Sequence, residues 1–130
     1  MTANDVYRTA VSFLFEKPRE DAGFYDNFLS LLNLCLQEAL PYQNSRLRHR
    51  GEEPLEAAPV ISEMEEEIEY DDEIVRCALP FGVVSYYYQD EVDNFKAQDF
   101  RGRFIVALSD AAQCVDGVVE DIYGYGVDLE

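Results

Sequence analysis

Apolar residues recur at the spacing of an α-helix between Asp21 and Pro41, and no other part of the sequence restricts the fold as strongly. The residues that share this face are Phe24, Phe28, Leu31, Leu32, Cys35, Ala39 and Leu40. Leu29, Leu34 and Leu36 widen the apolar surface, so we expect the helix to be buried on much of its circumference. Asp21 can cap its first turn, and Pro41 is expected to end it.

Further helices are expected on both sides of this one. The first covers residues 2–17 and is stopped by Pro18. Another begins at Asp71 or Asp72, and Pro80 is expected to kink it. The last runs from 92 to 113, with Phe95, Phe100, Phe104, Ile105, Leu108 and Ala112 expected to face inward. The pattern predicts a mainly α protein built as a bundle of three to four helices.

The pattern changes between residues 41 and 70, where Asn44, Gly51, Pro54 and Pro59 interrupt any helix. Two short extended pieces, at 58–62 and 67–70, could pair as a hairpin. A structureless connection of this length is unusual inside a compact domain. We therefore expect a long extended arm or β-hairpin between the second and third helices, packed against something, with another subunit among the candidates.

This organisation predicts one helical domain over residues 1–113, with the crossing arm at about 41–70, and a separate C-terminal tail over 114–130. The tail mixes Val, Ile and Tyr with three glycines, so it could be a strand that docks elsewhere or a disordered end. The N-terminus shows no basic region followed by an apolar core, so we expect no signal peptide. No apolar run is long enough to span a bilayer.

The charge balance restricts the partners of the protein. Of 130 residues, 27 are acidic and 10 are basic, which gives a formal net charge of -17, while 48% apolar residues are enough for a core. Such a chain repels phosphate backbones and anionic membrane surfaces, so binding to either is disfavoured. A basic protein partner, a cation, or a need to avoid DNA remain open.

Residues that could carry catalysis are few, so we expect no enzymatic activity, no cofactor and no metal. The single histidine, His49, stands among arginines and has no nucleophile motif nearby, which favours a solvated basic turn. Cys35, Cys77 and Cys114 form no CxxC pair and each lies in an apolar stretch, which favours free thiols that pack as small hydrophobes. The tyrosines at 86–88 have acidic neighbours, which favours core packing over base stacking.

The acidic run at residues 63–73 is the most conspicuous local feature. It has no glycine turn to converge the carboxylates on one ion, so a metal site is disfavoured. A solvated charge run is the ordinary interpretation. The alternative is a functional acidic surface that either docks a basic partner or repels DNA.

Four segments of the chain resemble the head–tail connector (adaptor) proteins of long-tailed bacteriophages and prophages. They are YDNFLSLLN at 25–33, Gly51 with Pro54 and Leu55, IEYDDEIV at 68–75, and ALPFGV at 78–83. The resemblance covers about residues 2–112. Phe81 stands where the family has tyrosine, and the tyrosines at 86–88 have no counterpart.

The resemblance implies a structural virion protein, made in the host bacterial cytoplasm and located at the head–tail interface. Such adaptors form a ring, usually of twelve copies, on the portal protein. The ring extends the DNA channel, lets DNA pass without specific binding, and offers a surface for the next neck or tail-completion protein. A terminal segment commonly docks on the portal, which makes Tyr123 and Tyr125 in the tail candidate contacts.

Contacts in a closed ring are heterologous, so one patch meets a different patch on the neighbour. The chain has one basic cluster, formed by Arg46, Arg48 and Arg50, and one dense acidic run. We expect the basic cluster to pair with acidic groups of an adjacent subunit or of the portal. The acidic interface candidates are Glu65, Glu66, Glu67, Asp71 and Asp72.

Two other functions fit the same sequence. An acidic inhibitor that mimics DNA and blocks a host DNA-binding protein would explain the charge, although such mimics spread carboxylates along whole faces. Another neck or tail-completion protein with the same helical build is the second alternative.

Overall fold

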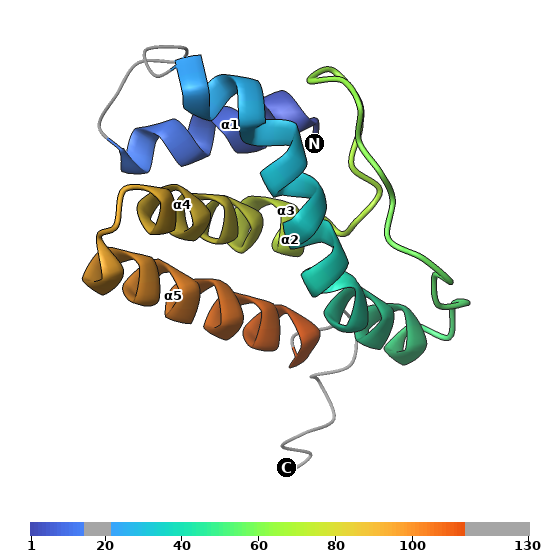
Figure 1. Ribbon diagram of the computed structural model, residues 1–130. Helices are drawn as coiled ribbons and strands as arrows, with labels where there is room; N and C mark the ends of the chain where they lie inside the picture. The colour runs from blue at the N-terminus through green and yellow to red at the C-terminus, as the bar shows by residue number, and fades with distance from the viewer. Residues whose placement is uncertain (15–21, 114–130) are drawn as a thin grey trace.

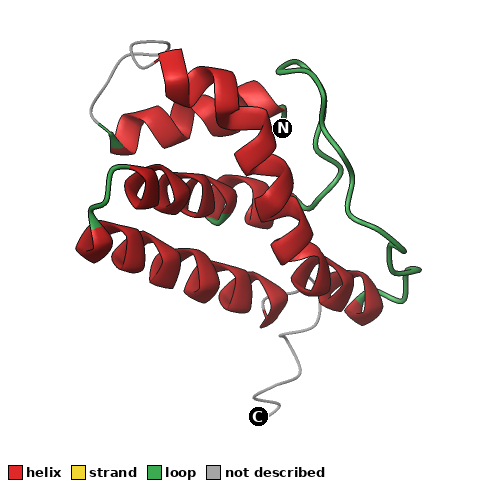
Figure 2. Ribbon diagram, viewed as in Figure 1, coloured by secondary structure: helices red, strands yellow, loops and turns green. Residues whose placement is uncertain are grey.

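The computed structural model describes residues 1–14 and 22–113, and this part of the chain is mainly helical. Its helices are α1 (Ala3–Phe13), α2 (Ala22–His49), α3 (Asp72–Cys77), α4 (Leu79–Asp90) and α5 (Asn94–Gln113). Figure 2 shows loops and turns, but no strand, between the helices of the described part. Within these residues no helix combines the length and the apolar character that crossing a membrane requires.

α4 is the central helix of the fold, since it contacts α1, α2, α3 and α5. Figure 1 shows α1, α4 and α5 as successive layers, with α2 crossing them on one side. Leu79, Val83 and Val84 of α4 are completely buried, together with Phe28, Leu32 and Leu36 of α2 and Phe104 and Leu108 of α5. One core therefore joins all the long helices.

α2 continues through Pro41 to His49, so the prediction that Pro41 ends the helix is wrong. A proline inside a helix costs about 3 kcal/mol, because it removes one hydrogen bond and crowds the preceding turn. The turns beyond Pro41 are nevertheless held by burial, since Gln43, Arg46 and Leu47 are all less than a tenth exposed. Figure 1 shows that α2 bends along its length, and a proline is the usual cause of such a bend.

The predicted hairpin is absent from the described residues, where only an isolated bridge joins Thr2 to Glu67. Residues 50–71 instead run irregularly along the outside of α2 and return to the N-terminus, as Figure 1 shows. Two asparagines of α2 hold this segment by imitating a strand partner. The Asn44 amide bonds both backbone groups of Leu55, and the Asn33 amide bonds both backbone groups of Ile61.

The end of this loop, at residues 68–70, is also anchored to α2 and to the N-terminus. The Tyr70 hydroxyl donates to the Leu36 carbonyl at 2.6 Å, and both Ile68 and Tyr70 are buried. The backbone N–H of Ile68 donates to the carbonyl of Met1. The segment thus packs on its own helices, and the expected arm over 41–70 is replaced by helix up to His49 and a docked loop after it.

The single helix that was expected to run through Pro80 with a kink is divided into two, since α3 ends at Cys77 and α4 begins at Leu79. Pro80 lies in the first turn of α4, where its missing N–H costs nothing. The tyrosines at 86–88 pack against the core, as predicted.

Phe95 contradicts the predicted inward face of α5, since it is 83% exposed while Phe104 and Leu108 are fully buried. Nine residues separate Phe95 from Phe104, which places them about half a turn apart on an ideal helix. One helix cannot bury both sides against α4. Cys35 is buried as predicted, whereas Cys77 is exposed and Cys114 lies outside the described residues.

Candidate interaction surfaces

Arg46 is the centre of a charged cluster that joins α2 to the start of α3 and the end of α5. Its residue exposure is 1%. Its guanidinium donates to the Asp71 carboxylate at 2.6 Å, to the Glu73 carboxylate at 3.1 Å and to the carbonyl of Ala111. The Gln43 amide completes the cluster by bonding both the side chain and the backbone N–H of Asp71.

Two of the three arginines that were expected to pair with a neighbouring subunit already have acidic partners in their own chain. Arg46 is buried within its own chain, and Arg50 bonds Asp71 and Glu52. Reversing the charge of Arg46 would therefore damage the monomer, so such a variant cannot report on assembly alone. Arg48 is exposed on the last turn of α2 and stays an interface candidate.

Asp71 has a strongly lowered pKa. Burial raises the pKa of its carboxyl, but hydrogen bonds from Arg50, Arg46 and Gln43 outweigh this effect and lower the pKa to about 2. The carboxylate is thus kept charged because its partners stabilise the ionised form. This makes Asp71 the acidic hub of the fold and removes it from the set of free surface carboxylates.

The cluster should make the fold sensitive to acid. The pKa of Asp71 is lower in the folded protein than in the unfolded chain. The ionised carboxylate therefore contributes fully to the free energy of unfolding above about pH 4, and this contribution is lost as the pH falls towards 2. We expect the free energy of unfolding of the wild type to exceed that of Asp71→Asn, and this gap to narrow by roughly 2 kcal/mol over that range. Urea denaturation of both proteins at several pH values measures this difference in the free energy of unfolding. A difference that does not change with pH would contradict a stabilising role for the ionised Asp71 carboxylate.

The other acidic candidates lie where a solvated surface would place them. Glu65, Glu66, Glu67 and Asp72 are exposed. Glu66 is used locally, since its carboxylate accepts from the backbone of Ser62 and Glu63, and these bonds lower its pKa. In the described part of the chain, no group of three or more acidic, histidine or cysteine side chains is placed to hold a metal ion. Tyr123 and Tyr125 lie outside the described residues.

The turn between α4 and α5 forms an apolar corner, which we define as Val92 and Phe95. Val92 has φ 57°, the left-handed conformation that usually takes glycine. The N–H of Val92 bonds the carbonyl of Gln89, and the N–H of Asp93 bonds the carbonyl of Tyr88, so the turn is a Schellman motif. A β-branched residue in this conformation is strained.

Packing within the chain does not explain why these two positions carry large apolar side chains, because Val92 is 77% exposed and Phe95 is 83% exposed. Ile105 and Val106 add further exposed apolar surface on α5. Residues with a strained backbone are found most often at functional sites. The apolar corner is therefore the candidate contact site, and the sequence pattern did not indicate it, since Phe95 was expected to face inward. The spacing between Phe95 and Phe104, which places them on opposite sides of a helix, was the signal in the sequence that Phe95 is exposed.

Relief of the strain at Val92 should be measurable. Glycine adopts positive φ without a steric penalty, so Val92→Gly is expected to stabilise the protein by about 1 kcal/mol. The melting temperature should rise by about 4 °C in a thermal denaturation followed by circular dichroism. Val92→Ala is the control, because alanine keeps the penalty for positive φ, and a stabilisation equal to that of glycine would show that side-chain exposure is the cause.

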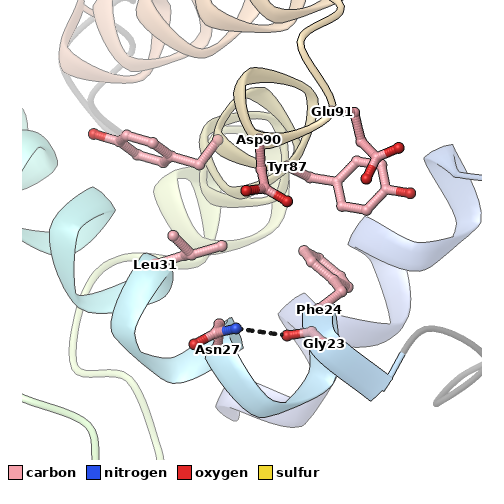
Figure 3. Close-up of a pocket in the computed structure, with 8 residues that line it drawn as sticks. Gly23, Phe24, Asn27, Leu31, Tyr87, Asp90 and Glu91 are labelled. Atoms are coloured by element: carbon pink, nitrogen blue, oxygen red, sulfur yellow. Dashed lines mark hydrogen bonds between the residues drawn. The ribbon is translucent and has the colours of Figure 1, made fainter.

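A pocket of about 260 Å³ lies beside the corner, between the start of α2 and the end of α4. It is lined by Gly23, Phe24, Asn27, Leu31, Tyr86, Tyr87, Asp90 and Glu91. Figure 3 shows the Asp90 carboxylate pointing from α4 into the space above Leu31 and Asn27. The Asn27 amide donates to the carbonyl of Gly23 at 2.9 Å.

Comparison of the chain with protein-family models, with curated proteins and with solved structures gives no match.

Proposed function

We propose that the protein is a structural virion component, a head–tail connector adaptor that forms a ring on the portal protein of a long-tailed bacteriophage. In this role it extends the DNA channel and offers the attachment surface for the next neck or tail-completion protein. It needs no cofactor and performs no catalysis.

The observation that carries the proposal is the apolar corner. The described helices already share one buried core, yet Val92 and Phe95 expose their side chains at a strained turn, and Ile105 and Val106 are exposed further along α5. Exposed apolar surface of this kind is typical of protein–protein contacts. A subunit of a ring needs such a surface to meet its neighbour.

The sequence resemblance gives the proposal its particular assembly, and the resembling segments lie at the main packing points. Asn33 holds the loop after α2, Tyr70 and Asp71 anchor the start of α3, and Gly82 lies against Cys35 and Phe104. In this chain, these residues are used for packing. The ring and the portal contact rest on the resemblance itself.

The exposed part of the acidic run at residues 63–73 fits the proposed passage of DNA through the ring. Its carboxylates at Glu63, Glu65, Glu67 and Glu69 are exposed, and their field repels a duplex instead of holding it. The same surface would also suit a DNA mimic that inhibits a basic host protein. Tight, salt-sensitive binding to such a protein, without binding to the portal, would favour the inhibitor.

Electron microscopy of the purified protein mixed with the portal from the same genome tests the proposal. We expect a ring of additional density on the portal with matching symmetry. A portal that stays bare at high protein concentration would overturn the adaptor role.

Phe95→Asp tests the corner directly. Because Phe95 is so exposed, we expect the stability of the monomer to change by less than about 0.5 kcal/mol, while the ring density disappears. Val60→Asp is the matched control, since Val60 is 75% exposed on the loop after α2. If both variants assemble normally, the corner is not a subunit contact. If both fail, the contact is not specific to the corner.

A further inference from the structure

We propose that the pocket between the start of α2 and the end of α4 binds the side chain of an arginine presented by a partner protein. The proposal stands apart from ring formation, because the pocket and its test involve only the isolated chain and a small probe. It also assigns a ligand chemistry to a site that the sequence did not indicate.

The size and shape of the pocket suit one side chain. Its volume of about 260 Å³ lies below the range of roughly 300–1,000 Å³ that drug-sized ligands occupy. Phe24 and Leu31 of α2 and Tyr86 and Tyr87 of α4 supply its apolar walls. An arginine has an apolar stem that such walls can cover, and a flat guanidinium that stacks on aromatic rings.

The charge of the pocket favours a cation. Among the described residues that line it, Asp90 and Glu91 are the only carboxylates, and none is a lysine, arginine or histidine. Both stand at the end of α4, where the helix dipole adds partial negative charge. The Asn27 side chain donates its N–H₂ group to the carbonyl of Gly23, so its oxygen is the atom of this amide that can accept from a cation.

Arg101, a basic residue of α5, pairs with a carboxylate that does not line the pocket. Arg101 donates to Glu38 at 2.9 Å, and Tyr86 donates to the same carboxylate at 3.1 Å. Arg101 and Tyr86 thus share the carboxylate of Glu38. The negative charge at Asp90 and Glu91 is left for a cation from outside the described part of the chain.

The aromatic wall is already in place before any ligand arrives. The rings of Phe24 and Tyr87 meet edge to face at 5.4 Å, and Phe24 stacks on Tyr7 at 5.9 Å. Phe24 is only 5% exposed, so the core holds its ring. A preformed wall lowers the entropic cost of binding.

Nuclear magnetic resonance of the ¹⁵N-labelled full chain, titrated with Nα-acetyl-arginine methylamide, tests the proposal. We expect saturable shifts of the Asn27, Tyr87, Asp90 and Glu91 amides, with a dissociation constant on the order of 1 mM for a single side chain. The matching citrulline compound has nearly the same shape without the charge, and we expect it to bind roughly tenfold more weakly. Equal binding of both compounds would overturn the cation site.

Two double variants separate the site from the overall charge. Asp90→Asn with Glu91→Gln should abolish the shifts, whereas Glu53→Gln with Glu56→Gln removes the same charge from exposed positions on the loop after α2 and should leave them unchanged. Equal losses in the two variants would reduce the effect to general attraction and overturn the proposal. All four residues are exposed, and the spectra of the free variants check that they are folded.

A cation of the same chain is the remaining alternative occupant. Lys17 and Arg19 precede Gly23 by a few residues in the sequence. If the probe binds only after Lys17→Gln with Arg19→Gln, the pocket serves the chain itself and the partner proposal is overturned. If the probe binds equally well with and without these two substitutions, the result supports binding of an arginine from a partner protein.

Discussion

Replacement of Arg46 by methionine is expected to lower the free energy of unfolding by about 3 kcal/mol, the largest effect of any single charged residue in the protein. Methionine keeps an unbranched apolar stem, but it is shorter than arginine and removes the charge and all its donors. Asp71 then loses one of its two arginine partners, and the carbonyl of Ala111 loses the donor that the structure gives it. A buried ion pair often adds little relative to an apolar replacement of both partners, but removal of one partner leaves the other uncompensated.

Arg48→Met is the matched control for this prediction, since Arg48 is two residues away in the same helix turn and is exposed. We expect it to change the free energy of unfolding by less than about 0.5 kcal/mol. Urea denaturation followed by far-ultraviolet circular dichroism measures both variants at neutral pH. A loss below about 1 kcal/mol for Arg46→Met would mean that the cluster is dispensable for stability.

The second large effect is expected at Gly82, where alanine should destabilise the protein by about 1–3 kcal/mol. A Cβ at this position would stand 2.8 Å from the sulfur of Cys35 and 3.0 Å from the ring of Phe104. Both neighbours are fully buried, so neither can move aside without disturbing the core. Gly82 thus allows α4 to approach α2 and α5 closely.

Gly102→Ala supplies the control with the opposite sign. Gly102 lies inside α5, and no atom of the described residues would come within 4 Å of a Cβ added there, so alanine should stabilise the helix by about 0.5–1 kcal/mol.

Cys35→Ala should reduce the destabilisation caused by Gly82→Ala, because it removes the nearest clashing atom, the sulfur of Cys35. A double-mutant cycle measures this coupling. Additive effects at positions 35 and 82 would show that the clash is relieved elsewhere.

Elements with a strong local cause could be predicted from the sequence. The helix is interrupted just before Pro80, because proline is favoured in the first turn of a helix and disfavoured in its interior. The apolar spacing around Phe28, Leu32 and Cys35 correctly indicated the buried face of α2. These features depend on neighbours within a few residues.

Other elements depend on contacts that are distant in the sequence. α2 passes through Pro41 because Gln43 and Arg46 bind Asp71, nearly thirty residues later. The loop after α2 takes its path from Asn33 and Asn44, whose amides hold backbone that no periodic pattern marks. Local propensity cannot contain this information.

The candidate site was the least predictable part. Exposure of Phe95 follows from which side of α5 meets α4, and the positive φ of Val92 belongs to the hydrogen-bonded turn that joins the two helices. The pocket joins Phe24 and Asn27 to Asp90 and Glu91, which lie more than sixty residues apart in the sequence. Sequence spacing alone gave no reason to place these residues together.

The sequence by itself determined that the chain is helical and strongly acidic and that its helical pattern is disturbed near Pro80, because composition and short-range patterns are sufficient for each of these properties. Only the tertiary structure decided that Arg46 is an internal residue, that the loop after α2 packs on its own chain, and that Val92 and Phe95 are left exposed. The physical reason is that burial and ion pairing depend on which surfaces meet after the helices pack, and this choice involves the whole core at once.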